Sequence, residues 1–135
     1  LPVDAVVARE FKEGAPSDVV DVRAMPKDAM MLDVGPVTVQ DLTKRLKDCR
    51  TRVWYGPLGA FEIKPVDAGT SELARAPAKL TRDGTQISVE GGGDTVSALI
   101  NEGVGAELCD VAAAGGAVLE WLEGKDLPGV AVRRT

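Results

Sequence analysis

The chain has 135 residues, of which 44% are hydrophobic, a length and composition that suit one domain with a modest core. Lysine and arginine number 16 against 21 acidic residues, and the resulting net charge of −5 argues against a nucleic-acid-binding module, whose affinity rests on a basic surface. There is no histidine, which excludes His-dependent catalytic triads and His-ligated metal sites. Cys49 and Cys109 form no metal-binding pattern and are expected to be buried free thiols. No apolar run approaches the ~20 residues of a membrane-spanning helix.

The first part of the chain alternates short apolar runs with punctuated or amphipathic stretches. The valine-rich run Pro2–Ala8 is predicted to be a strand buried on both faces. Residues 11–27 mix glycine and proline with scattered charges, which favours an irregular loop. Met30–Val34 is a second strand candidate, and the helical spacing of apolar residues over 42–49 predicts an amphipathic helix.

The remaining elements repeat a strand-then-helix order. A short strand is expected at 52–54, and a helix over 70–80 that Pro77 should end or kink. A strand at 86–89 leads into a helix near 96–100, and a strand at 108–112 leads through a Gly-Gly turn into a helix over 117–123. This order is typical of an α/β domain with a parallel sheet. Trp54 and Trp121 are both expected to pack inward.

The segment Gly91-Gly92-Gly93-Asp94-Thr95 is a candidate phosphate site, because it joins a strand to a helix. Glycines let phosphates approach free backbone amides, Thr95 offers a hydroxyl, and Asp94 could hold Mg²⁺. The structural alternative stays open, since any tight strand–helix turn needs glycine, and the segment matches neither a P-loop nor a GxGxxG fingerprint. Glu62, which follows a Gly/Pro turn, is either a ligand for a ribose diol or a solvated surface residue.

Several motifs occur together in one order: Leu1-Pro2-Val3-Asp4, Leu32–Pro36, Trp54–Glu62, Gly69-Thr70, Gly91–Thr95, Leu119–Lys125 and Leu127–Val130. This series resembles the C-terminal part of phosphoglycerate kinase over essentially the whole chain. The resemblance implies a truncated Rossmann-like, three-layer α/β fold with about four mostly parallel strands, in a single partial domain over 1–135. In that family the C-terminal domain holds the nucleotide, the N-terminal domain holds 3-phosphoglycerate, and hinge closure brings them together for phosphoryl transfer.

The resemblance implies nucleotide-binding roles for Gly56, Pro57, Leu58, Glu62, Gly92, Gly93, Asp94 and Thr95. The first three would border the adenine pocket, and Glu62 would bind the ribose hydroxyls. The last four would lie at the phosphates, with Asp94 next to the nucleotide-bound Mg²⁺.

Four positions in two segments depart from the family pattern. Tyr55 stands where the family normally has asparagine next to the phosphates. Ala112, Ala113 and Ala114 stand in a turn that normally reads Ser-Thr-Gly, so two hydroxyls and one glycine are lost. Charge stabilisation is nearly the whole of catalysis in phosphoryl transfer, so a degenerate phosphate loop should weaken it.

The family's cationic residues lie in regions that precede Leu1, so no kinase activity is expected from this chain by itself. A sheet edge and an apolar face should also be bare, which predicts protein subunits that cover them. Because the chain starts without methionine, either a leader was removed or the chain was cut from something longer. An intracellular location is expected, and removal of a leader would place the protein in an organelle such as a plastid or a mitochondrion.

Two functional hypotheses remain. In the first, the chain is a pseudoenzyme that requires no cofactor and serves as an accessory subunit of a larger assembly, which does not span a membrane but could be peripheral to one. In the second, it is the nucleotide-binding part of a phosphoglycerate kinase, which binds Mg-ADP or Mg-ATP and transfers phosphate between 1,3-bisphosphoglycerate and ADP in glycolysis or carbon fixation. Tyr55 and the alanines at 112–114 favour the first hypothesis, whereas Glu62, Asp94 and Thr95 favour the second.

Overall fold

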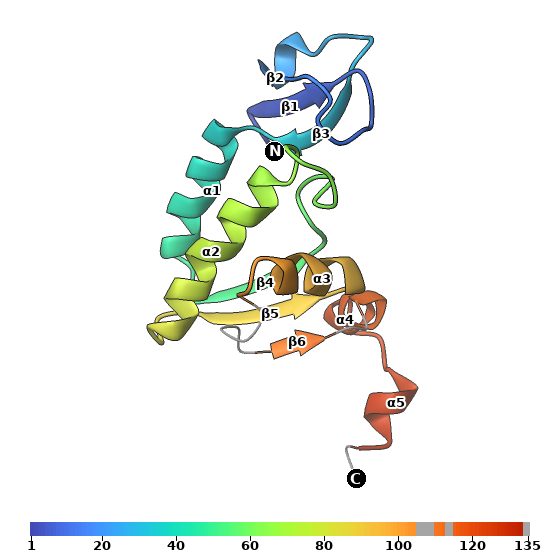
Figure 1. Ribbon diagram of the computed structural model, residues 1–135. Helices are drawn as coiled ribbons and strands as arrows, with labels where there is room; N and C mark the ends of the chain where they lie inside the picture. The colour runs from blue at the N-terminus through green and yellow to red at the C-terminus, as the bar shows by residue number, and fades with distance from the viewer. Residues whose placement is uncertain (105–109, 113–114, 134–135) are drawn as a thin grey trace.

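The computed structural model describes residues 1–104, 110–112 and 115–133, within which six strands form two separate sheets of three (Figure 1). The first sheet has the order β2-β1-β3 and is antiparallel throughout, with β1 at Asp4–Ala8, β2 at Ser17–Asp21 and β3 at Met30–Val34. A short 3₁₀ turn, η1 at Val22–Ala24, follows β2. The sequence predicts a loop over 11–27, and β2 corrects that expectation. Its pairing is decided by the free edge of β1, because local propensity in this segment is weak.

The second sheet is parallel and has the order β4-β5-β6, with β4 at Thr51–Tyr55, β5 at Ile87–Gly91 and β6 at Asp110–Ala112. The α/β class and the parallel sheet are thereby confirmed. The expected count of about four mostly parallel strands is corrected, because β1, β2 and β3 form their own antiparallel sheet. Residues 108 and 109 of the predicted last strand lie outside the described residues, and Cys109 with them.

The described helices are α1 at Pro36–Lys47, α2 at Ala68–Arg82, α3 at Gly93–Asn101, α4 at Gly115–Leu122 and α5 at Pro128–Ala131. Pro77 is predicted to end or kink its helix, and the first of these outcomes is wrong, because α2 continues to Arg82. Burial of Leu73, Ala74 and Ala78 on either side of the proline holds the helix together, and such packing offsets the lost backbone hydrogen bond. No helix in these ranges is long and apolar enough to cross a membrane.

The core lies between the parallel sheet and the helices α1, α2 and α3. Its buried members are Trp54, Leu73, Ala74, Ala78, Leu99 and Val104, with Leu42, Leu46 and Leu58 packed against them. The inward packing predicted for Trp54 is therefore confirmed. The same prediction is wrong for Trp121, which is 52% exposed on α4. Cys49 is also exposed rather than buried, since α1 ends at Lys47 and the helical spacing does not extend to it.

The two faces of the parallel sheet differ. Side chains alternate along β4, so that Arg52 and Trp54 point into the core while Val53 and Tyr55 point to the outer face. Val53 and Ile87 are exposed on this outer face. Helix α4 covers only its carboxyl end, where Val118 lies close to Gly91. This arrangement agrees with the bare apolar face that the sequence predicts.

Candidate functional site

Two strand–helix turns meet at the carboxyl end of the parallel sheet. The first leads from β5 through Gly92 into α3, and the second leads from β6 into α4, which begins at Gly115. The Cβ of any other residue at Gly115 would lie only 2.7 Å from Cα of Gly92 and 2.9 Å from its nitrogen. The N-termini of α3 and α4 are therefore side by side, at the edge where open α/β sheets bind their ligands. The Gly-Gly pair predicted as a turn is instead the first turn of α4.

Gly92 has a φ of +98°, which only glycine adopts without strain, so this turn depends on its glycine. A helix N-terminus presents unpaired N–H groups and the positive end of the helix dipole. Two such termini in contact are a candidate site for an anion such as a phosphate group.

Two buried threonines hold the turn after β4, Thr95 at the start of α3 and Thr70 in α2. The N–H of Gly56 donates to Oγ1 of Thr95 at 2.7 Å, and the N–H of Leu58 donates to Oγ1 of Thr70 at 3.0 Å. Trp54 Nε1 donates to the carbonyl oxygen of Gly56 at 2.5 Å. The structure thus brings Thr95 together with Gly56, linking the predicted phosphate segment to the predicted adenine turn. This contact spans 39 positions, so the residue types alone did not indicate it.

A hollow of about 370 Å³ lies beside the same turn. Its lining residues are Met31, Leu32, Asp33, Pro57, Leu58, Gly59 and Ala60. Pro57 and Leu58, two of the three residues expected at adenine, line the hollow, whereas Gly56 does not. The lining combines apolar side chains, among them Pro57 and Leu58, with a similar share of polar surface.

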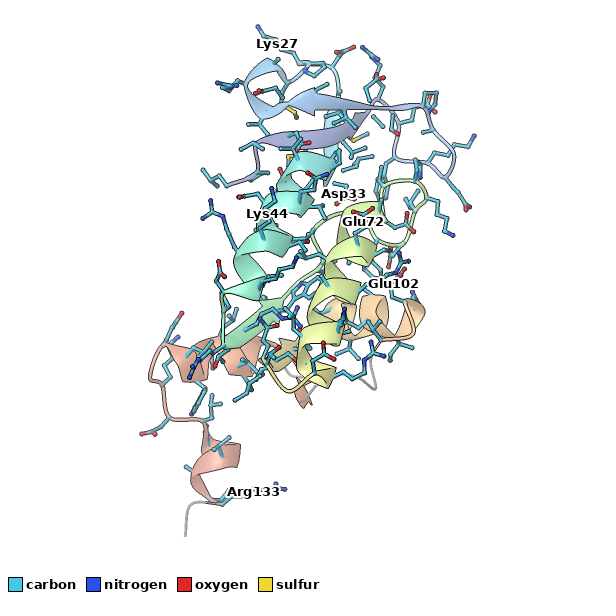
Figure 2. All side chains as sticks on the ribbon, turned by 90° about the vertical axis from the view of Figure 1, so that its left-hand side faces the viewer. Lys27, Asp33, Lys44, Glu72, Glu102 and Arg133 are labelled. Carbon is cyan, nitrogen blue, oxygen red and sulfur yellow. The ribbon has the colours of Figure 1, made fainter. Side chains whose placement is uncertain are left out.

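Asp33 is a site residue that the sequence analysis missed. It is 1% exposed; its Oδ1 accepts from the N–H of Val34 at 2.8 Å, and its Oδ2 accepts from the N–H of Gly69 at 2.7 Å. Burial raises the pKa of Asp33, although these two hydrogen bonds act in the opposite direction. It lies where β3 meets the start of α2 and supports the wall of the hollow (Figure 2). The sequence contains a signal for this residue, because Asp33 is the one charged side chain in the apolar run Met30–Val34.

The two predicted carboxylates, Asp94 and Glu62, are both exposed. Asp94 lies in the first turn of α3, where an acid also interacts favourably with the helix dipole. No group of three or more His, Cys, Asp or Glu residues that could hold a metal occurs within the described ranges. One accessible carboxylate beside the candidate phosphate site nevertheless fits Mg²⁺, which proteins usually bind through one or two carboxylates together with the substrate's phosphates.

Tyr55 ends β4 and lies beside both turns. Its ring carbons are 3.5 Å from the positions that a Cβ would take on Gly91 and on Gly92, and a Cβ on Gly115 would overlap Cε2 of the ring. Of the alanines in the degenerate turn, Ala112 is the last residue of β6. Ala113 and Ala114 lie outside the described residues.

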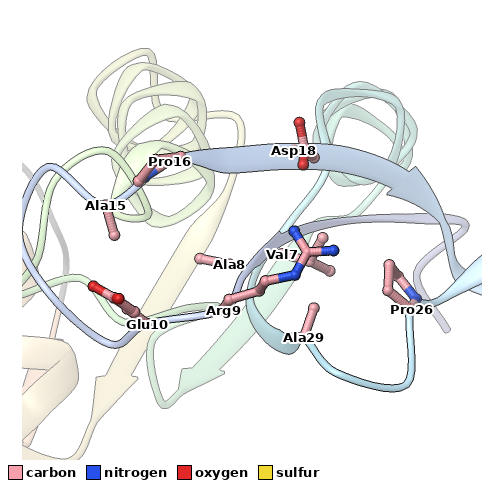
Figure 3. A pocket seen from close by; sticks show the side chains of 9 residues that line it. All are labelled: Val7, Ala8, Arg9, Glu10, Ala15, Pro16, Asp18, Pro26 and Ala29. Carbon is pink, nitrogen blue, oxygen red and sulfur yellow. The ribbon is translucent and has the colours of Figure 1, made fainter.

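A second hollow, of about 290 Å³, lies on the antiparallel sheet and is remote in sequence from every predicted site residue (Figure 3). It is lined by Val7, Ala8, Arg9, Glu10, Ala15, Pro16, Asp18, Pro26 and Ala29. Arg9 extends across it and donates from Nε to Oδ2 of Asp28 at 2.8 Å. Since both partners are largely exposed, this ion pair contributes little to stability.

The chain is similar to known proteins over nearly all of its length. The family model described as phosphoglycerate kinase matches residues 1–125. Phosphoglycerate kinase of Granulibacter bethesdensis is 58% identical over 134 residues, covering 99% of this chain and 34% of that protein. The same enzyme of Agrobacterium fabrum is 53% identical over 135 residues, covering 100% of this chain and 34% of that protein.

The solved structures agree with these relatives. Phosphoglycerate kinase from Coxiella burnetii superposes with a TM-score of 0.88 at 42% identity, over 98% of this chain and 33% of that one. The enzyme from Pyrococcus horikoshii gives a TM-score of 0.78 at 26% identity, over 96% of this chain and 31% of that one. The chain spans about a third of the length of the relatives it matches.

Proposed function

This chain belongs to the phosphoglycerate kinase family, and we propose that it forms the nucleotide-binding part of such an enzyme. The relatives reported above carry the name of the enzyme, which supports this hypothesis better than that of an accessory subunit. Because the chain spans about a third of those relatives, phosphoryl transfer between 1,3-bisphosphoglycerate and ADP is proposed for the whole enzyme.

The observation that carries the proposal is the contact between Gly92 and Gly115, which brings the N-termini of α3 and α4 together. Each helix terminus favours a nearby negative charge by about 0.3–1 kcal/mol in exposed settings. Two adjacent termini therefore form a local site for phosphates in a chain whose net charge is −5. The hollow at Pro57 and Leu58 lies beside the turn that Thr95 attaches to this site, which suits a ligand with phosphates at one end and a base at the other.

We propose roles for two further residues in binding a magnesium nucleotide. Asp94 would hold Mg²⁺, which neutralises phosphate charge when it is bound. Glu62, in the segment that follows Ala60 at the rim of the hollow, would bind the ribose hydroxyls. Both carboxylates are accessible from solvent, as such contacts require.

We expect binding without turnover from this chain by itself. Phosphoryl transfer requires positive charge at the transferring group, and the segment 91–95 contains neither lysine nor arginine. The exposed apolar side chains of Val53 and Ile87 on the outer face of the sheet support coverage by further polypeptide, which in a whole kinase would be other parts of the enzyme.

Calorimetric titration with Mg-ADP tests the proposal. We expect a dissociation constant in the micromolar range for the unmodified chain. Asp94→Ala should weaken the binding of Mg-ADP and leave metal-free ADP unaffected. The matched control is Asp126→Ala, another exposed aspartate that lies between α4 and α5. Absence of heat at millimolar Mg-ADP would refute the proposal and favour the accessory-subunit hypothesis.

A further inference from the structure

The geometry points to Tyr55 as a specificity-determining residue of this site. Its ring covers the joint between the two glycine turns, which is the place where Gly92 meets Gly115. The ring must move before a phosphate can bind there. This inference rests on the proposed function, because it concerns the same site. Tyr55 has no part in the nucleotide-binding roles given above.

The ring of Tyr55 lies next to three glycines, Gly91, Gly92 and Gly115. Tyr55 pairs with Gly91 in the parallel register, so its side chain leaves the sheet directly beside the start of the first turn. Its Cδ2 and Cε2 atoms approach the Cβ positions of Gly91 and Gly92 to 3.5 Å, and Cε2 occupies the space that a Cβ on Gly115 would need. The ring fits there because Gly115 has no side chain, whereas a Cβ on Gly91 or Gly92 would meet the ring at ordinary van der Waals distance.

The same place is the one that a phosphate bridging both turns would take. An anion must come within about 2.7–3.2 Å of a backbone nitrogen to accept its hydrogen bond. The edge of the ring already occupies the space next to Gly115, because a Cβ on that glycine would overlap Cε2, and Gly92 lies directly beside Gly115. Ring and phosphate consequently compete for the joint between the turns.

The ring can be displaced. Tyr55 is 47% exposed, so one side of the ring packs on the glycines while the rest meets solvent. Exposed side chains change rotamer on fast timescales, and rotation about χ1 moves the ring away from the turns. The apparent dissociation constant of a phosphate ligand is then raised by the fraction of molecules in which the ring has moved aside.

This competition concerns only the phosphate end of the ligand. A nucleoside without phosphates uses the hollow at Pro57 and Leu58 and does not reach the joint. The ring therefore lowers the affinity for nucleoside diphosphates and triphosphates and leaves that for the nucleoside unchanged. The effect depends on the volume of the ring and is independent of its hydroxyl group.

The test compares Mg-ADP and adenosine in calorimetric titrations of four proteins. Tyr55→Ala should bind Mg-ADP about tenfold more tightly than the unmodified chain, as expected if the open state is about a tenth of the population. Its affinity for adenosine should not change. Tyr55→Phe, which keeps the ring, should behave as the unmodified chain. Val53→Ala is the matched control, since Val53 is exposed on the same strand and the same face, two residues before Tyr55.

The possible outcomes separate this inference from the proposed function. If the unmodified chain binds Mg-ADP and Tyr55→Ala binds it equally or more weakly, the inference is wrong and the proposed function stands. Weaker binding by Tyr55→Phe would show that the hydroxyl group is a ligand, which also overturns the inference. If none of the four proteins binds Mg-ADP, the inference and the proposed function both fail. Urea denaturation of each variant establishes that a change in affinity does not reflect unfolding.

Discussion

Thr95 and Gly56 are 39 positions apart, yet Oγ1 of Thr95 accepts a 2.7 Å hydrogen bond from the N–H of Gly56. Thr95 is 1% exposed in the first turn of α3, and Gly56 begins the turn after β4. One buried hydroxyl therefore sets the position of the predicted adenine turn relative to the glycine-rich segment.

Replacement of Thr95 by valine keeps the shape of the side chain and removes the acceptor. The N–H of Gly56 would then lose its partner, at a cost of about 1–3 kcal/mol in the free energy of unfolding. Thr95→Ser retains the hydroxyl and should recover most of that loss. Urea denaturation measures both values, and a Thr95→Val protein as stable as the serine variant would contradict the assigned role.

Asp4 should make stability depend on pH in the acid range. Burial alone would raise the pKa of Asp4, but hydrogen bonds from the Thr38 hydroxyl and from the N–H groups of Val37 and Thr38 lower it overall. Because the pKa of the folded state lies below the unfolded value of 3.8, its contribution is present above that pH and is lost as pH falls through the folded pKa.

The Asp4→Asn variant tests this dependence. It should lose about 1–3 kcal/mol at neutral pH, because an amide cannot accept all three hydrogen bonds at the start of α1. The difference in unfolding free energy between the two proteins should narrow below pH 3.8. A constant difference from pH 7 to pH 2 would show that Asp4 does not contribute through its charge.

Arg52 and Glu90 form a buried ion pair between β4 and β5, in which Nη2 of Arg52 donates to Oε1 of Glu90. The guanidinium group also lies over the ring of Trp54, 5.2 Å from its centroid. Burial raises the pKa of Glu90, and the adjacent guanidinium opposes that shift. Arg52 Nε and Nη1 and Glu90 Oε2 make no hydrogen bond within the described part of the chain.

Removing one partner of this pair should be far worse than removing both. Glu90→Leu leaves a buried guanidinium uncompensated and should cost about 3–5 kcal/mol. The double replacement Arg52→Met with Glu90→Leu should be close to neutral or stabilising, since it removes two desolvated charges together. Urea denaturation measures the free energy of unfolding of each protein, and a double variant clearly less stable than the unmodified protein would mean that the pair stabilises the fold.

Cys49 should react with a thiol reagent in the folded protein. Its side chain is exposed, and Sγ makes only a weak contact to the carbonyl oxygen of Arg45 at 3.4 Å. We expect rapid labelling without denaturant, measured by the absorbance of the released reagent. The rapid phase of labelling should be absent in Cys49→Ser. Labelling of the unmodified chain that needs denaturant would indicate that Cys49 is covered in solution.

Features that depend on neighbouring residues along the chain were predictable. The strand at 86–89, the glycine-rich turn and the following helix all agree with the structure, because each follows from local periodicity and from the conformational freedom of glycine. Trp54 was placed correctly inside, since it alternates with exposed residues on a short strand.

Features that depend on what packs against a segment could not be predicted from the sequence. Residues 17–21 form a strand because β1 offers an edge, and Trp121 is exposed because little in the described part of the chain packs against α4. The helix that contains Pro77 continues because its flanking residues are buried. Propensity and spacing contain no information on these partners.

The amino-acid sequence by itself determined the family of this chain, the absence of histidine chemistry and the presence of a glycine-rich strand–helix turn, since all three are written in the order of the residues. Only the tertiary structure decided that Thr95 binds Gly56, that Asp33 supports the hollow and that the ring of Tyr55 lies beside Gly92 and Gly115. Each of these contacts joins residues far apart in the chain, and the packing of helices and sheets brings them within a few ångströms of one another.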